Sequence, residues 1–262
     1  MSDLINILAC PDCLGELAVT PTGAECTACG HAYADAGGYL DLGPASHAPP
    51  GGLGQFFLQD PLHVTRYERH SRISFLQIMG DNWENTLTPE AEDDYLRTHL
   101  TPSDVPLLDL ACGAGRWTRT LVDHLGLDQV VALDLSVPMI DTIRTAIPGI
   151  RVLRGTALRL PFATASLGAV NCSNALQLLP SPREVLREVG RCLRPGGVFT
   201  AFTYRRAERP TYRHFQRQQE ETFGLRSFTP AELMTWLTSA GLDLVDLRSP
   251  AGMLLLTARR TA

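Results

Sequence analysis

Two segments constrain the fold of this chain most strongly: LLDLACGAG at residues 107–115 and VVALDLS at residues 130–136. The pattern of each segment predicts an apolar strand. The strand at 107–110 is followed by a glycine turn, and the strand at 130–134 ends with an acidic residue. The spacing from Gly113 to Asp134 is close to the ~20 residues between glycine loop and ribose-binding acid in a Rossmann-type βαβ unit. We therefore predict a nucleoside site, although the first segment alone is also compatible with a simple strand-to-helix turn.

The same segments distinguish two nucleoside ligands. A dinucleotide-binding loop needs a third glycine, and this chain has Thr118 at that position. The carboxylate of Asp109, just before the loop, would repel a pyrophosphate and attract an ammonium group. S-adenosylmethionine carries an ammonium and a sulfonium but no phosphate. The charge pattern therefore favours S-adenosylmethionine over NAD as the cofactor.

Strand and helix patterns alternate from residue 105 to the end of the chain. Capping-box sequences at Ser181 and Thr229 mark two of the helix starts. The last two strands are separated by a four-residue turn and must pair antiparallel. This order predicts an α/β fold with a Rossmann-like, mainly parallel, seven-stranded sheet and helices on both faces.

In such a sheet, ligands bind beyond the carboxyl ends of the strands, at the switch point. That rule gathers several residues around one predicted crevice: the loop from Ala111 to Gly115, Asp134, Ala157, Leu158 and Asn174.

Four cysteines near the amino terminus form two C-x-x-C pairs, Cys10 with Cys13 and Cys26 with Cys29. Two such pairs can place four thiolates around one ion, and tetrahedral Zn²⁺ is the expected species, with an iron–sulfur cluster as the weaker alternative. A four-cysteine site has no open coordination position, so we expect a structural metal. About 40 residues have too little core to fold without such a ligand.

The chain divides into three predicted parts: a zinc ribbon over 1–43, a Pro/Gly-rich linker over 44–58, and the α/β domain over 59–262. A net charge of −5 argues against a general polyanion-binding surface. No apolar stretch is long enough to span a bilayer, and no signal peptide is recognisable. We therefore expect a cytoplasmic protein, with no membrane partner and cysteines that are thiols or metal ligands.

The α/β part resembles the class I S-adenosylmethionine-dependent methyltransferases, especially the ubiquinone/menaquinone-type branch. LDLACGAG, VVALDLSVPMI and LREVGRCLRPGGVF match three motifs of that family in order, within residues 95–260. By this resemblance Asp109 and Gly113 border the methionine end, Asp134 holds the ribose, and Leu135 and Met139 flank the adenine. Residues 4–43 resemble the zinc-ribbon activator subunits of tRNA and protein methyltransferases, and the zinc head of bacterial 23S rRNA guanine-N1 methyltransferases.

Two positions depart from the family pattern. Thr156 stands where the family usually has an acid near the adenine amino group, and Gln177 lies in a stretch that often holds a histidine. Either neutral drift or altered chemistry would explain them. No catalytic residue can be named. Side chains on three segments are candidates for a substrate pocket: Tyr67, Arg72, Gln177, Tyr204, Tyr212 and His214. An amphipathic helix would also explain the candidates around residues 67–72 and 204–214.

Three functions remain open at this point. The leading hypothesis is methylation of a small-molecule metabolite at O, N or C. The second is methylation of an RNA base, with the ribbon gripping RNA, so a nucleic-acid partner stays possible. The third is a methyltransferase-like protein that binds the cofactor and catalyses a non-methylating reaction.

Overall fold

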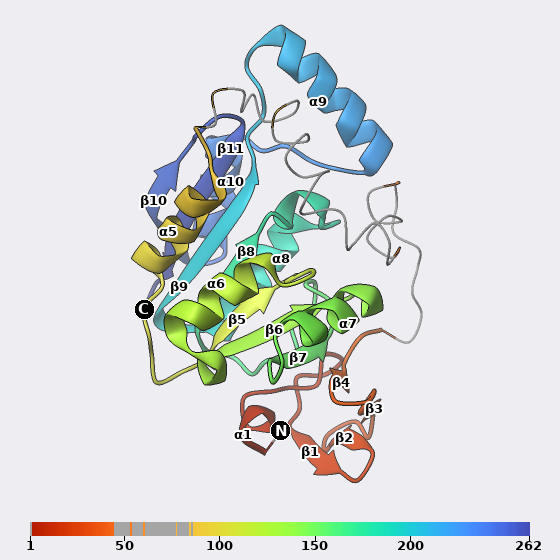
Figure 1. The fold of residues 1–262 in the computed structure, drawn as a ribbon. Coiled ribbons are helices and arrows are strands. Elements are labelled where there is room, and N and C mark those ends of the chain that lie inside the picture. The colour runs from red at the N-terminus through yellow and green to blue at the C-terminus, as the bar shows by residue number, and fades with distance from the viewer. Residues whose placement is uncertain (1, 45–52, 54–59, 61–76, 78–83, 85) are drawn as a thin grey trace.

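A computed structural model describes residues 2–44, 53, 60, 77, 84 and 86–262. Its centre is a sheet of eight described strands in the order β10-β11-β9-β8-β5-β6-β7-β4 (Figure 1). The strands of this sheet are β4 Leu40–Asp41, β5 Leu107–Leu110, β6 Val130–Asp134, β7 Arg151–Arg154, β8 Leu167–Ser173, β9 Leu193–Tyr204, β10 Leu242–Arg248 and β11 Met253–Arg260.

The strand directions follow the predicted pattern. The neighbours from β4 to β9 are all parallel, whereas β11 runs antiparallel to both β9 and β10. From β5 the chain builds outward through β6 and β7, and it then returns to the other side of β5 with β8. The switch point of the sheet therefore lies between β5 and β8, where a ligand crevice is expected.

Helices cover both faces of the sheet (Figure 1). In the view of Figure 1, α5 (Pro89–His99), α6 (Arg116–Leu125) and α7 (Val137–Ala146) lie in front. Behind lie α8 (Pro182–Cys192) and α10 (Pro230–Ser239), which contact each other. Helix α9 (Pro210–Phe223) stands beyond the carboxyl end of β9. Short helices complete the described chain: α1 Ser2–Ile5, η2 Leu127–Gln129 and η3 Leu176–Leu178.

The central strands are buried on both faces, which explains their nearly continuous apolar sequences. Leu107 and Val130 belong to the core cluster that includes side chains of α5, α6 and α7. Leu108 and Val131, one residue further along each strand, belong to the cluster on the face of α8 and α10. Alternate residues thus serve opposite faces.

The amino-terminal segment contributes to two sheets. Strands β1 (Leu17–Thr20), β2 (Gly23–Cys26) and β3 (Ala32–Ala34) form an antiparallel ribbon of their own. Strand β4 then pairs parallel with β7, at the edge of the main sheet. The expectation of seven strands was therefore wrong by one, because a strand of the amino-terminal segment joins the large sheet. The division into 1–43, 44–58 and 59–262 stays a prediction.

Two of the predicted helix starts differ in their caps. Thr229 forms a full capping box with Glu232, as predicted. Ser181 precedes α8, but its side chain makes no capping hydrogen bond. The sequence pattern therefore predicted where α8 and α10 begin, but it predicted the capping contact correctly only for α10.

Candidate cofactor and metal sites

The loop after β5 has the backbone conformation expected of a ligand-binding turn. Gly113 and Gly115 have φ angles of 55° and 89°, a region that favours glycine. A Cβ atom at Gly115 would lie 2.7 Å from Cγ1 of Ile143, so this glycine lets α7 approach the loop. Ala111 also has a positive φ, 54°, although it carries a side chain. The loop therefore keeps a conformation that costs energy at Ala111.

Asp134, the predicted ribose-binding acid, ends β6 directly beside this loop. Its Oδ2 accepts a hydrogen bond from the Gly113 N–H and its Oδ1 one from the Ser136 N–H, each 2.8 Å long. Burial raises the pKa of this carboxyl group, and the backbone N–H groups oppose the shift. A carboxylate has about four acceptor positions, so two hydroxyl groups can still bind. The side chain is thus held in a fixed orientation with acceptor capacity left.

Asp109 lies deeper than its predicted role suggests. Its carboxylate is 2 % exposed and accepts hydrogen bonds from Thr118 Oγ1 at 2.5 Å and from Asn171 Nδ2 at 2.7 Å. Asn171 in turn accepts from Ser173 and Thr200. Burial raises the pKa of Asp109 to about 6. This network joins β5, β8 and β9 at the switch point, and contact of Asp109 with an ammonium group stays a prediction.

Sequence reasoning missed two of these partners. Thr118 was noted only as the absent third glycine, but its hydroxyl is the donor to Asp109. Asn171 is a fully buried amide in an otherwise apolar strand. A polar residue in the middle of such a strand was the available signal, because buried polar groups need hydrogen-bond partners.

The residues predicted near the adenine lie along the same edge of the sheet. Asp134 is in register with Arg154, and the Gly155 N–H donates to the Asp134 carbonyl at 3.0 Å. Thr156 follows directly, and its hydroxyl accepts a 3.3 Å hydrogen bond from the Leu158 N–H. The remaining predicted residues are half-buried or buried in this region: Leu135, Met139, Ala157 and Leu158. The structure thus brings these positions together, while their contacts with a ligand stay predicted.

Asn174 and Gln177 form one unit after β8. Asn174 has a φ of 54°, and its N–H donates to the Phe202 carbonyl at 2.8 Å. The Gln177 amide donates to the Asn174 carbonyl at 2.8 Å and accepts from Thr203 Oγ1 at 3.1 Å. Gln177 is 2 % exposed. Its amide therefore fixes the backbone of Asn174, whereas the sequence suggested that it could line a substrate pocket.

The other pocket candidates are not gathered in one place by the described residues. Tyr204 is buried in the core cluster beside α5. Tyr212 is half-buried, with the Arg209 guanidinium 5.5 Å from its ring centroid, and His214 is exposed on α9. Tyr67 and Arg72 lie outside the described residues, so their assignment stays a prediction.

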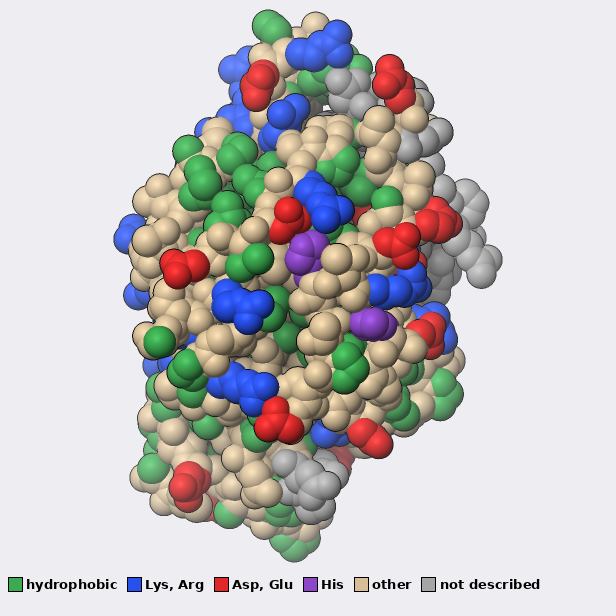
Figure 2. All heavy atoms as spheres, turned by 90° about the vertical axis from the view of Figure 1, so that its left-hand side faces the viewer, with side chains coloured by type: hydrophobic (Ala, Val, Ile, Leu, Met, Phe, Trp, Pro, Cys, Tyr) green, Lys and Arg blue, Asp and Glu red, His purple; other side chains and the backbone are tan. Residues whose placement is uncertain are grey.

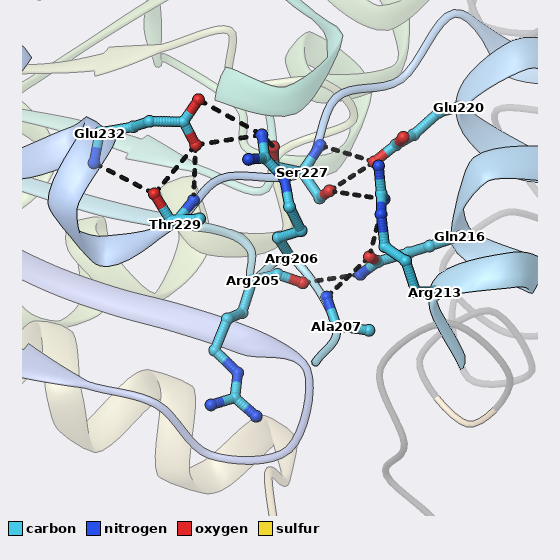
Figure 3. Close-up of polar contacts among 9 residues, drawn as sticks. All are labelled: Arg205, Arg206, Ala207, Arg213, Gln216, Glu220, Ser227, Thr229 and Glu232. Carbon is cyan, nitrogen blue, oxygen red and sulfur yellow. Dashed lines mark hydrogen bonds and ion pairs between the residues drawn. The ribbon is translucent and has the colours of Figure 1, made fainter. Parts of the chain in front are cut away.

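Helix α9 is attached to the domain by a polar network (Figure 3). Gln216, its single buried residue, donates to the Arg205 carbonyl at 2.6 Å and accepts from the Ala207 N–H at 2.8 Å. Glu220 pairs with Arg213 at 2.9 Å and accepts from the Ser227 N–H at 3.1 Å. These contacts fix the middle and the carboxyl-terminal half of the helix.

The four amino-terminal cysteines converge as predicted. Their sulfur atoms all lie within 4.8 Å of one another, with 3.8 Å between Cys10 and Cys29 and 3.5 Å between Cys13 and Cys26. Four thiolates around Zn²⁺ at about 2.3 Å would be about 3.8 Å apart, so the cluster fits this ion. The donor set is complete without His31, whose Nδ1 lies 2.8 Å from an Asp12 oxygen.

Charged side chains of both signs are interspersed on the face shown in Figure 2. Among the described residues, no helix has the length and apolar character needed to cross a membrane.

Comparison with known proteins agrees with this architecture. Residues 107–197 match the family model of a methyltransferase domain. An uncharacterised chloroplastic methyltransferase of Arabidopsis thaliana is 30 % identical over 225 residues, which is 76 % of this chain and 62 % of that protein. The chain thus spans less than two thirds of this relative. Demethylmenaquinone methyltransferase of Lactococcus lactis is 35 % identical over 97 residues, covering 35 % of this chain and 38 % of that protein.

Among solved structures, a chain in the complex with the Trm112 methyltransferase activator of Haloferax volcanii is similar in fold. Its TM-score is 0.59 at 18 % identity, and the match covers 76 % of this chain and 97 % of that one. The family match identifies residues 107–197 as a methyltransferase domain, and the strand order and these similarities show that the surrounding sheet and helices share the fold of methyltransferase structures.

Proposed function

We propose that this protein transfers the methyl group of S-adenosylmethionine to a small organic acceptor. The observation that carries the proposal is the orientation of Asp134, whose two oxygens are fixed by N–H groups of Gly113 and Ser136 at the end of β6. A carboxylate so placed can accept both hydroxyls of a ribose. The neighbouring positive-φ loop leaves backbone accessible to the rest of the cofactor.

The chemistry asks little of the protein beyond binding. The sulfonium is already a strong electrophile, so the enzyme must align the acceptor with the methyl carbon and exclude water. Asp109 and Asp134 provide negative charge near a cationic cofactor. A general base is needed only for a weakly acidic acceptor. Its absence from the set of predicted residues is therefore compatible with methyl transfer.

We further propose that Cys10, Cys13, Cys26 and Cys29 hold a structural Zn²⁺. The four sulfur atoms leave no position for a substrate. Since β4 follows the ribbon and pairs with β7, the metal would also stabilise the edge of the methyltransferase sheet. The activator in the Haloferax complex is a separate protein, whereas here the cysteine module belongs to the same chain.

Calorimetry with S-adenosylhomocysteine tests the cofactor assignment directly. Wild type should bind, and Asp134→Ala should weaken binding by 10-fold or more, since two charge-assisted hydrogen bonds are worth roughly 1.5–3 kcal/mol each. Asp128→Ala is a suitable control, because this acid lies before β6 and outside the predicted crevice. Binding of a nicotinamide or flavin instead would contradict the proposal. Incubation with methyl-labelled cofactor and a metabolite extract then tests transfer.

A further inference from the structure

A surface hollow of about 640 Å³ lies between the start of α8 and the carboxyl end of α10. Three arginines line it: Arg183 and Arg187 of α8, and Arg226 from the segment before α10. All three are exposed, and in the described part of the chain none of them takes part in an ion pair. Glu184 also lines the hollow. Three arginines and one glutamate give a local charge of 3 − 1 = +2, in a chain whose net charge is −5.

Several arginines elsewhere in the domain have an acidic partner. Arg116 pairs with Asp93, Arg154 with Asp41 and Arg191 with Glu188. The three arginines line the same hollow as a single glutamate and, among the described residues, form no ion pair with it; their charges repel one another, and a bound anion would relieve that repulsion. The arginine hollow thus differs from the ordinary charge arrangement of this protein.

One of the three arginines is held in place. The Arg226 guanidinium lies 5.8 Å from the centroid of the Trp236 ring, which also lines the hollow. Trp236 is itself packed edge-to-face on Phe228, with ring centroids 5.9 Å apart. The Arg226 N–H donates to the Gln177 carbonyl at 2.9 Å. Backbone and side chain of this arginine are therefore both positioned before any ligand arrives.

The amino-terminal end of α8 adds to the positive potential. Helix dipoles place partial positive charge at this end, where phosphate groups frequently bind. Guanidinium groups recognise phosphate oxygens through paired hydrogen bonds. The volume of the hollow is within the range of small-molecule sites. Trp236 supplies an apolar surface for an organic portion of the ligand.

We propose that the arginine hollow is a binding site for a phosphate-bearing small molecule, separate from the cofactor crevice. Calorimetry with inorganic pyrophosphate tests this on the full chain. Wild type should show saturable binding, and the double variant R183A/R187A should weaken it by about 10-fold or more, as expected from loss of a charged hydrogen bond of about 1.5 kcal/mol. Arg217→Ala removes an exposed arginine of α9 outside the hollow, and it should leave pyrophosphate affinity within about 2-fold, since isolated surface charges contribute little.

Three results would overturn the proposal: no saturable pyrophosphate binding to wild type, an equal loss in Arg217→Ala, or binding of single-stranded RNA without pyrophosphate binding. The RNA measurement across a salt series identifies a nucleic-acid surface by its steep slope. S-adenosylhomocysteine binding, measured on every variant, reports whether the fold is intact. The same measurement separates the phosphate site from the proposed methyltransferase function. If wild type binds pyrophosphate but not S-adenosylhomocysteine, only the methyltransferase assignment is contradicted. Arg187→Gln provides a milder substitution if the double variant is unstable.

Discussion

Removing the Asp41 carboxylate tests how firmly the amino-terminal segment is joined to the methyltransferase sheet. Asp41 lies on β4 and accepts hydrogen bonds of 2.7 and 2.8 Å from Nη1 of Arg154 on β7. The Arg154 side chain is 5 % exposed, and its Nε donates to the Leu135 carbonyl at 3.1 Å. The ion pair therefore connects the ribbon, through one buried guanidinium, to a residue predicted to flank the adenine.

The magnitude follows from burial. Removing one partner of a fully buried ion pair costs about 3–5 kcal/mol. Because the Asp41 side chain is 30 % exposed, solvent screening reduces this value, and we expect Asp41→Ala to cost about 2–3 kcal/mol. In a protein of this size, each 1 kcal/mol lowers Tm by about 2–4 °C. The variant should therefore melt about 4–12 °C below wild type.

Scanning calorimetry and urea unfolding with zinc present would measure the change. Asp94→Ala is the matched control, since Asp94 pairs with Arg97 on the surface with 75 % of its side chain exposed. It should cost less than about 0.5 kcal/mol. Asp41→Asn separates loss of charge from loss of packing. If Asp41→Ala were no more destabilising than Asp94→Ala, the ion pair would not constrain the sheet edge and the reasoning would be refuted.

Four further predictions concern the cofactor loop, the effects of pH on cofactor affinity and on stability, and the metal. Ala111→Gly should stabilise the protein by about 0.5–1 kcal/mol in urea unfolding, because glycine removes the cost of the positive φ while part of this gain is lost to the greater entropy of the unfolded chain. The control Ala132→Gly, in the buried strand β6, should destabilise the protein. If Ala111→Gly were the more destabilising of the two, the strain argument would be contradicted. Since the pKa of Asp109 is raised to about 6, its carboxyl group is largely uncharged at pH 5. The affinity for S-adenosylmethionine should therefore rise about 10-fold from pH 5 to 7. An affinity of wild type that does not change with pH would exclude a role of the Asp109 charge in binding the cofactor. The same raised pKa means that folded protein holds the proton more tightly than unfolded protein, so Asp109 should reduce stability as pH rises from about 4 to 6, and Asp109→Asn should remove that slope in melting experiments. Removing the metal with a chelator should lower the free energy of unfolding by several kcal/mol. Calorimetry would measure this change, and metal analysis of the same sample would confirm that the ion is gone. An unchanged Tm after complete loss of the metal would contradict a structural ion.

Much of the fold was predictable because its signals are local. The capping-box sequence at Thr229 located the start of α10, and the short turn before β11 required antiparallel pairing with β10. The Cys10, Cys13, Cys26 and Cys29 cluster followed from spacing alone. These patterns depend on neighbours within a few residues or on a well-known ligand geometry.

The parts that sequence reasoning missed depend on contacts between distant residues. Strand β4 has two residues, too few for any periodic pattern, and its partner β7 lies more than 100 positions away. The burial of Gln177 depends on Thr203 of β9, which no spacing in its own segment indicates. The polar network around Asp109 likewise draws on three strands and one helix. Sequence reasoning thus named positions that the structure brings together at one edge of the sheet, while it did not identify the partners of their polar groups.

The pairing of β4 with β7 also has a consequence for self-association. An unprotected outer strand presents a row of free amide and carbonyl groups to other chains, which invites edge-to-edge aggregation. Here the short β4 caps β7, and the charged Asp41 follows Leu40 on that outermost strand. A shortened protein that began after residue 43 would retain the methyltransferase motifs and lose this cap. We expect it to form oligomers or to precipitate more readily than the intact chain.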